Sequence, residues 1–269
     1  MIKIADLELP DEASRLLKQY QAEVDRADDY GARVNAAKSE FKRRNIRSNP
    51  AFVAVRAQLT GMCSGIGRCM YCEDAPADEV EHHRPKDLYP ELVFAWRNFL
   101  YACGPCNGPK NNRFAVIDGC TGEVVDVARG RHAPMIPPAP GAPALLDPRR
   151  EDPLDYLMLD LRDTFEFSPY PDLDSVGQQR AEYTIEVLRL NQRDQLAAAR
   201  ENAFGGYRAR LREYVQRRSE GATPEELTRL KAGFRTSPHV TVWVEMQRQH
   251  RYHPVLAELF AATPEALDF

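Results

Sequence analysis

The sequence reads Cys-Met-Tyr-Cys at residues 69–72 and Cys-Gly-Pro-Cys at residues 103–106. Each stretch has the Cys-x2-Cys spacing, in which a tight turn brings two thiolates to one point. Two such turns together supply the four thiolates of a tetrahedral zinc site, and a complete thiolate shell leaves no position for a substrate. We therefore predict a structural zinc ion bound by Cys69, Cys72, Cys103 and Cys106.

Two further cysteines, Cys63 and Cys120, lie outside these pairs. Cys63 could replace one of the four ligands, although its distance from Cys69 in the sequence is less natural for a zinc turn. The N-terminal residues do not resemble a signal peptide, so we expect a cytoplasmic protein. Paired cysteines in such a protein are more often metal ligands than disulfides, which favours zinc over a covalent link.

The 269 residues divide into four regions by pattern. Hydrophobic residues recur at helical spacing in residues 1–60 and 176–269, which are predicted to be N-terminal and C-terminal helical regions. Residues 61–115 are rich in glycine, cysteine and proline and form the predicted zinc-containing module, and residues 116–175 form an irregular connection with short strands. The predicted fold class is therefore α+β and mainly helical. No apolar run approaches the ~20 residues of a membrane-spanning helix.

Local signals give sharper expectations in the second half of the chain. A hairpin is predicted around residues 118–127, and strands are predicted at residues 156–159 and 164–167. Thr223 followed by Pro224 predicts the start of a helix, because threonine caps helices and proline suits their first position.

Charge is unevenly distributed. The net charge is -4, which argues against a general nucleic-acid coat but allows a local basic site. The segment from residue 38 to residue 56 is basic, and Glu40 is its single acid. A contact with nucleic acid and a solvated helix face are equally good interpretations of its cations, which are Lys38, Lys42, Arg43, Arg44, Arg47 and Arg56.

Further motifs lie between and just after the cysteine pairs. Residues 79–86 read Glu-Val-Glu-His-His-Arg-Pro-Lys, residues 96–100 read Trp-Arg-Asn-Phe-Leu, and residues 106–110 read Cys-Asn-Gly-Pro-Lys. In order and spacing these motifs resemble the HNH endonuclease family. The resemblance implies a ββα-metal module that hydrolyses phosphodiester bonds in DNA, with Mg²⁺ or Mn²⁺ as the catalytic ion.

The resemblance also implies roles for individual residues. His82 matches the general base, Glu81 the acidic metal ligand before it, and Asn107 a second metal ligand. Asn98 matches the residue that orients the base and braces its loop. The chemistry agrees: a neutral imidazole can activate water, and carboxylate and amide oxygens suit a hard divalent cation. Since Glu81 and His82 would face opposite sides of a regular strand, a bend must bring them to one site.

Some assignments stay open. His83 could be the base or a second metal ligand in place of His82, or it could simply pack within the protein. Four cations near the motifs could contact phosphates or could be ordinary surface charges, namely Arg84, Lys86, Lys110 and Arg113.

A longer and weaker likeness extends beyond the motifs. Residues 71–73, 89–91, 146–153 and 181–191 are similar to HNH nucleases of bacterial anti-phage systems, such as the Septu nuclease subunit and retron-associated HNH proteins. That likeness implies a defence role and a partner of the ABC/SMC-like ATPase type. The alternative is a zinc-stabilised subunit that binds nucleic acid or protein without catalysis.

Overall fold

The computed structural model describes residues 1–269 and begins with three helices. These are α1 (Asp11–Asp25), α2 (Tyr30–Arg44) and α3 (Pro50–Met62). Side-chain caps define two of the starts: Asp29 accepts a hydrogen bond from the amide of Ala32 at 2.7 Å, and Asn49 accepts from the amides of Ala51 and Phe52. Capping side chains satisfy amides that have no partner within the helix.

The middle of the chain contains a strand–strand–helix unit. Strand β1 (Glu79–His82) pairs antiparallel with β2 (Phe99–Ala102), and helix α4 (Gly104–Lys110) follows directly. Glu81 lies opposite Leu100 in this pairing, and His82 lies opposite Phe99. The connection between the strands contains the 3-10 turns Pro90–Leu92 and Trp96–Asn98. The unit therefore carries the motifs of residues 79–86 and 106–110 on adjoining elements.

Short strands follow. β3 (Ala115–Ile117) lies between β4 (Val124–Asp126) and β5 (Ala142–Pro143), and β6 (Leu157–Leu159) pairs with β7 (Phe167–Pro169).

The predicted hairpin and the first predicted strand are confirmed, but the second predicted strand begins late, at Phe167. Phe165 has a φ of 53°, in the left-handed region, which a regular strand does not allow. The amide of Thr164 instead donates to Asp160 within the turn.

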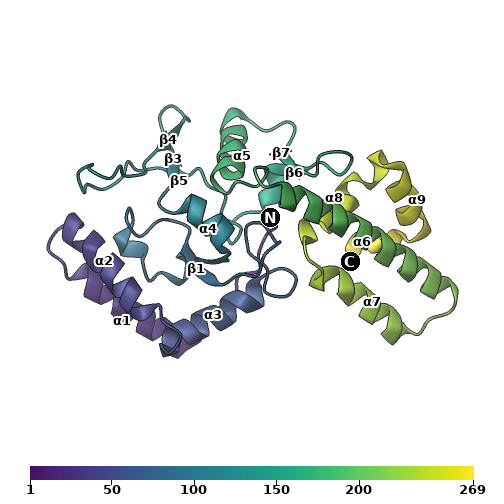
Figure 1. The fold of residues 1–269 in the computed structure, drawn as a ribbon, viewed down its shortest axis with the longest axis horizontal. Helices are drawn as coiled ribbons and strands as arrows, with labels where there is room; N and C mark the ends of the chain where they lie inside the picture. Colours follow the sequence, from purple (N-terminus) through teal and green to yellow (C-terminus); the bar gives the residue numbers. More distant parts are fainter.

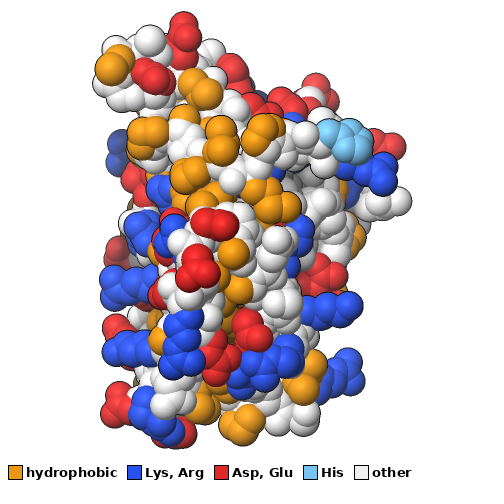
Figure 2. Space-filling view, turned by 90° about the vertical axis from the view of Figure 1, so that its left-hand side faces the viewer, with side chains coloured by type: hydrophobic (Ala, Val, Ile, Leu, Met, Phe, Trp, Pro, Cys, Tyr) orange, Lys and Arg blue, Asp and Glu red, His pale blue; other side chains and the backbone are white.

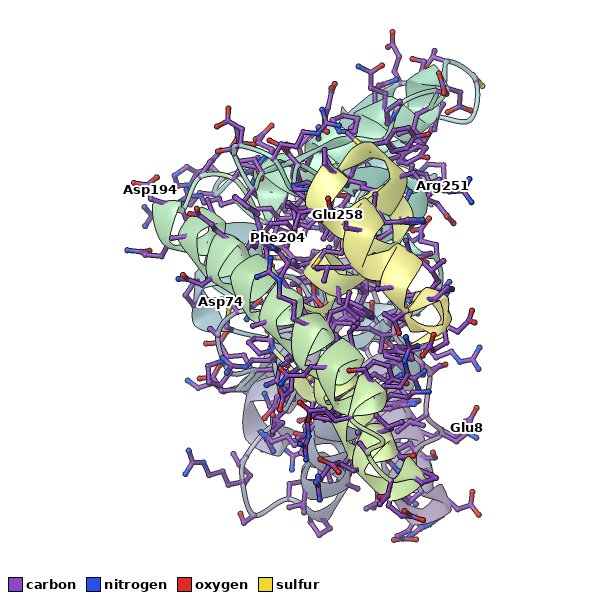
Figure 3. The ribbon with its side chains drawn as sticks, turned by 90° about the vertical axis from the view of Figure 1, so that its right-hand side faces the viewer. Glu8, Asp74, Asp194, Phe204, Arg251 and Glu258 are labelled. Carbon is purple, nitrogen blue, oxygen red and sulfur yellow. The ribbon has the colours of Figure 1, made fainter.

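The C-terminal part consists of five α-helices and two 3-10 turns. Helix α7 begins at Pro224 as predicted, and the Thr223 hydroxyl accepts from the amide of Glu226 at 3.2 Å. Helix α6 runs diagonally across one side of the molecule, from the labelled Asp194 past Phe204 (Figure 3). The α-helices are α5 (Ser175–Val187), α6 (Asp194–Ser219), α7 (Pro224–Thr236), α8 (Val240–Gln249) and α9 (Pro254–Ala262). The two 3-10 turns of this part are His250–Tyr252 and Pro264–Asp268. A further 3-10 turn, Pro153–Asp155, belongs to the connection before it.

The parts are joined by shared packing. Helices α1–α3 lie on one side of the strand–strand–helix unit and α6–α9 on the other (Figure 1). One hydrophobic cluster of 53 buried residues extends through all of them, from Met1 to Ala266. The fold is thus a mixed, helix-rich α+β structure, as predicted. None of its helices combines the length and the apolar composition that crossing a membrane requires.

Candidate metal centre and polar cavity

The four paired cysteines form one buried cluster. Their sulfur atoms lie within 4.8 Å of one another, and the sulfurs of Cys72 and Cys103 are 3.7 Å apart. Zinc–sulfur bonds of about 2.3 Å in a tetrahedron place neighbouring sulfurs about 3.8 Å apart. The cluster is therefore close to the geometry that a zinc ion requires. Cys63 is outside it: its thiol donates to the carbonyl of Leu59, and burial raises its pKa to about 12. The alternative ligand set with Cys63 is wrong.

Contacts from distant parts of the chain hold the cluster. The amide of Met70 donates to the carbonyl of Tyr101 at 3.0 Å, which joins the first cysteine turn to β2. The amide of Cys103 donates to the sulfur of Cys69 at 3.3 Å, and Arg193 donates to the sulfur of Cys106 at 3.3 Å. Such donors orient thiolates and offset their negative charge.

A polar cavity of about 290 Å³ opens beside the cluster. Glu81 and His82 line it from β1, Asn107 lines it from α4, and Lys86 lines it from the loop after β1. Three residues to which the family resemblance gives catalytic roles therefore line one cavity. Asn98, His83, Arg84, Lys110 and Arg113 do not line this cavity.

His82 is held in a defined orientation. Its ring contacts Phe41 and Phe99 edge-on, with centroids 4.4 and 5.2 Å away. Nε2 lies 2.9 Å from the carbonyl of Val93, so it must carry the proton, and Nδ1 keeps its lone pair. Burial, with the positive charge of Lys86, lowers the pKa of His82 to about 3. The imidazole is therefore neutral, and Nδ1 offers its lone pair as a hydrogen-bond acceptor.

Glu81 lies in a buried ion pair. Tyr71 donates its hydroxyl to Oε2 at 2.9 Å, and the ammonium of Lys110 pairs with Oε1. Lys110 is completely buried and also donates to the carbonyl of His82 at 2.8 Å. Its position does not support the predicted contact with phosphate. The physical reason is that a buried carboxylate needs a neutralising partner, and Lys110 provides it.

Asn107 contacts a carboxylate that sequence reasoning missed. Its Nδ2 donates to Oε2 of Glu79 at 2.6 Å, and Glu79 also lines the cavity. A signal was present in the sequence, because Glu79 and Glu81 stand two residues apart and side chains alternate along a strand. The family resemblance drew attention to Glu81 alone.

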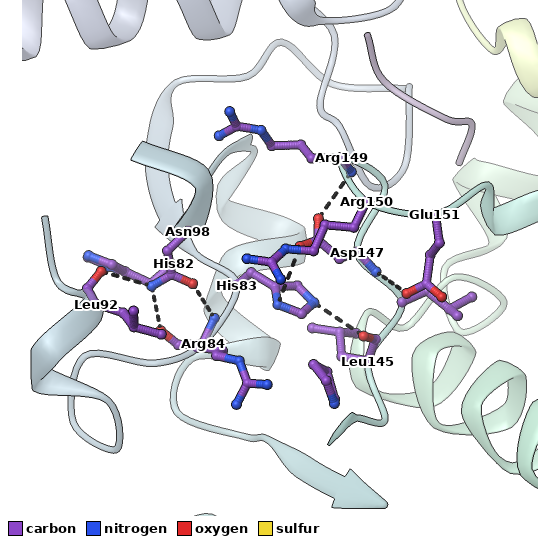
Figure 4. Close-up of polar contacts among 12 residues, drawn as sticks. His82, His83, Arg84, Leu92, Asn98, Leu145, Asp147, Arg149, Arg150 and Glu151 are labelled. Atoms are coloured by element: carbon purple, nitrogen blue, oxygen red, sulfur yellow. Dashed lines mark hydrogen bonds and ion pairs between the residues drawn. The ribbon is translucent and has the colours of Figure 1, made fainter. Parts of the chain in front are cut away.

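His83 and Asn98 make hydrogen bonds next to the cavity without lining it. His83 is buried; its Nε2 lies 3.2 Å from the carbonyl of Leu145, and its Nδ1 lies 3.9 Å from Asp147 (Figure 4). Burial lowers its pKa, against the opposing charge of Asp147. Asn98 accepts from the amide of Arg84 at 2.8 Å and donates to the carbonyls of Arg84 and Leu92. It thus ties both ends of the loop that follows His82.

Most of the candidate cations have other partners. Arg84 lies over the ring of Tyr89, 4.8 Å from its centroid, and Arg113 pairs with Glu186 at 2.5 Å. In the basic segment, Arg43 and Arg44 both pair with Glu23. Figure 2 shows this side of the molecule, where acidic and basic side chains are interspersed over its lower part. These pairs favour the interpretation of a solvated helix face.

Comparison with known proteins gives one short similarity. No family model matches the chain. A stretch of 48 residues is 50% identical to the Septu protein PtuB of Bacillus thuringiensis. The stretch covers 16% of this chain and 19% of that protein, so the match spans about a fifth of the relative's length.

Proposed function

We propose that the protein is a metal-dependent HNH endonuclease that hydrolyses phosphodiester bonds in DNA. One observation carries this proposal: Glu81, His82 and Asn107 line a single polar cavity next to a four-cysteine cluster. Strand β1, strand β2 and helix α4 follow one another in the order that the resemblance implies for a ββα-metal module.

The residues of the cavity suit a hard divalent cation. Carboxylate and amide oxygens are the ligands that Mg²⁺ and Mn²⁺ prefer, and the thiolates that would select zinc belong to the separate cluster. When bound, such an ion supplies positive charge for the phosphoryl and leaving oxygens. In this proposal Glu81 and Asn107 are its ligands.

His82 is the proposed general base. Its Nε2–H is fixed by the carbonyl of Val93, so Nδ1 takes the proton of the water that attacks phosphorus. Asn98 is a positioning residue, since its three hydrogen bonds hold the loop between Arg84 and Leu92. Among the four candidate cations, Lys86 is the one that lines the cavity and can meet a phosphate there.

Plasmid cleavage tests the proposal. We expect the zinc-loaded protein to cut plasmid in Mg²⁺ or Mn²⁺ and to leave 5′-phosphate and 3′-hydroxyl ends. His82→Ala should abolish cleavage, while the exposed His132→Ala should leave it unchanged. His83→Ala decides between the two histidines: loss of cleavage in that variant alone, with folding intact, would move the base to His83.

A defence role is the second part of the proposal. The similarity to the Septu protein PtuB supports an anti-phage function, in which the protein acts beside an ABC/SMC-like ATPase that restrains or licenses cleavage. Co-expression of the chain with an ATPase encoded beside it should yield a complex with altered cleavage. Full activity of a chain that never associates with the ATPase would contradict the partnership.

The non-catalytic alternative has one observation in its favour. Both carboxylate oxygens of Glu81 already have protein partners, Tyr71 and Lys110. A zinc-stabilised subunit of this kind would bind nucleic acid with a strong salt dependence, or bind a protein partner, and would not cut DNA under any metal condition.

A further inference from the structure

Glu79 differs from Glu81 in its surroundings. The two residues stand two positions apart on β1, which places them on one face of the strand, and both line the polar cavity. Glu79 is exposed to solvent, whereas Glu81 is only 3% exposed. A cation that enters the cavity from solvent therefore reaches the carboxylate of Glu79 without displacing a protein group.

Glu81 has less to offer a cation as the structure stands. The hydroxyl of Tyr71 occupies Oε2 at 2.9 Å, and the buried ammonium of Lys110 neutralises Oε1. Separating a buried ion pair costs several kcal/mol, because each charge is left without compensation. Glu81 can therefore contribute to an ion mainly through lone pairs that these partners leave free.

Glu79 and Asn107 each have an oxygen with no hydrogen bond in the chain. Nδ2 of Asn107 donates to Oε2 of Glu79 at 2.6 Å, which leaves Oδ1 of Asn107 and Oε1 of Glu79 free. This bond keeps the two side chains together at the same cavity wall. A Cβ at Gly104 would lie 3.6 Å from Oε1, so the missing side chain leaves that oxygen open.

A second polar group in the cavity lacks a partner. His82 is only 6% exposed, and its Nδ1 makes no hydrogen bond within the chain. This nitrogen is open to solvent, so it can accept a hydrogen bond from a ligand or from a ligand-bound water. His82 lines the cavity that Glu79 and Asn107 also line.

We propose that Glu79 and Asn107 are direct oxygen ligands of the divalent cation, and that Glu79 is its principal carboxylate. Mg²⁺ and Mn²⁺ are commonly bound through one or two carboxylates with several waters retained, which this small donor set matches. The proposal rests on the proposed function, since it names a further residue of the same site.

Binding of Mn²⁺ alone tests this assignment. The full zinc-loaded chain is titrated with Mn²⁺, and free Mn²⁺ is followed by electron paramagnetic resonance. Glu79→Gln should raise the Kd for Mn²⁺ by roughly ten-fold or more. The matched control is Asp78→Asn, which removes a neighbouring exposed carboxylate that does not line the cavity and should leave the Kd unchanged. Zinc content and circular dichroism confirm that both variants fold.

The outcomes separate this inference from the proposed function. If wild type binds Mn²⁺ and cuts plasmid while Glu79→Gln binds Mn²⁺ equally well, the role of Glu79 is refuted and the nuclease proposal stands. An equal loss of affinity in Asp78→Asn also refutes it, because the effect is then one of general charge. If wild type neither binds Mn²⁺ nor cuts DNA, both proposals fail.

Discussion

Arg193 donates a hydrogen bond of 3.3 Å to the sulfur of Cys106, which precedes it by 87 residues. Arg193 is the residue immediately before helix α6, so the bond links the C-terminal helices to the second cysteine turn. Four thiolates around one zinc ion carry excess negative charge, and a half-buried guanidinium beside them compensates part of it.

We expect Arg193→Ala to weaken zinc retention. Removal of a group that supports a metal ligand typically costs 10- to 100-fold in metal affinity, by the order of magnitude known for such contacts. The measurement is competition for zinc against a chromogenic chelator. Arg212→Ala removes an exposed arginine from helix α6 itself and serves as the control. Equal zinc affinity in the two variants would show that the Arg193 contact is unimportant.

Lys110→Met should destabilise the protein by about 3–5 kcal/mol, because it leaves the buried carboxylate of Glu81 without its partner. Chemical denaturation measures the free energy of unfolding, and Lys42→Met, at an exposed position of α2, provides the comparison. If Lys110 instead contacted phosphate directly, the Lys110→Met variant would keep its stability and bind DNA more weakly.

Arg149→Ala should cost about 1–3 kcal/mol in the free energy of unfolding, because it leaves carbonyl groups in the interior without their donor. The buried guanidinium of Arg149 pairs with Asp6 and donates to the carbonyls of Trp96 and Phe99 at 2.6 and 2.7 Å. The neighbouring Arg150 is mostly exposed and pairs with Asp147 alone, so Arg150→Ala should cost less than about 1 kcal/mol. Similar losses for both variants would contradict the distinction between the buried guanidinium of Arg149 and the exposed one of Arg150.

Glu245 gives a prediction for pH. Burial raises its pKa, against hydrogen bonds from Gln249 and the charge of Arg248. The folded state therefore keeps this proton at pH values where the unfolded state has released it. The stability it contributes is complete below the ordinary pKa of glutamate and is lost as pH rises through the raised value.

Accordingly, the stability of wild type relative to Glu245→Gln should fall as pH rises from about 4 toward neutrality and then level off. Thermal unfolding across this range provides the measurement. Glu258→Gln, at an exposed position of α9 (Figure 3), should run parallel to wild type. Parallel curves for Glu245→Gln would mean that the carboxyl titrates normally.

Local sequence rules predicted those features that depend on short spacing. The two Cys-x2-Cys pairs predicted the cysteine cluster, and Thr223 with Pro224 predicted the start of α7. Each cysteine turn and the helix cap form within a few residues of chain, where backbone geometry leaves few alternatives. The need for four thiolates around one zinc ion then predicts that the two turns meet.

The choice of side-chain partners was not predictable in the same way. Lys110 looked like a surface cation one helical turn after Asn107, yet it points inward to Glu81. That outcome depends on Tyr71 and on the burial of β1, which no spacing rule encodes. The alternation of side chains along β1 marked Glu79, but its hydrogen bond with Asn107 depends on the position of α4 relative to β1, a tertiary relationship.

The cysteine cluster has a topological consequence. With zinc bound, residues 72–103 become a closed ring, and both β strands and the loop between them belong to it. A protease that nicks this loop once, for example at the exposed Glu91, would not release either half, because the metal still joins them. Loss of zinc opens the ring and leaves the two fragments joined only by non-covalent packing in the shared hydrophobic core.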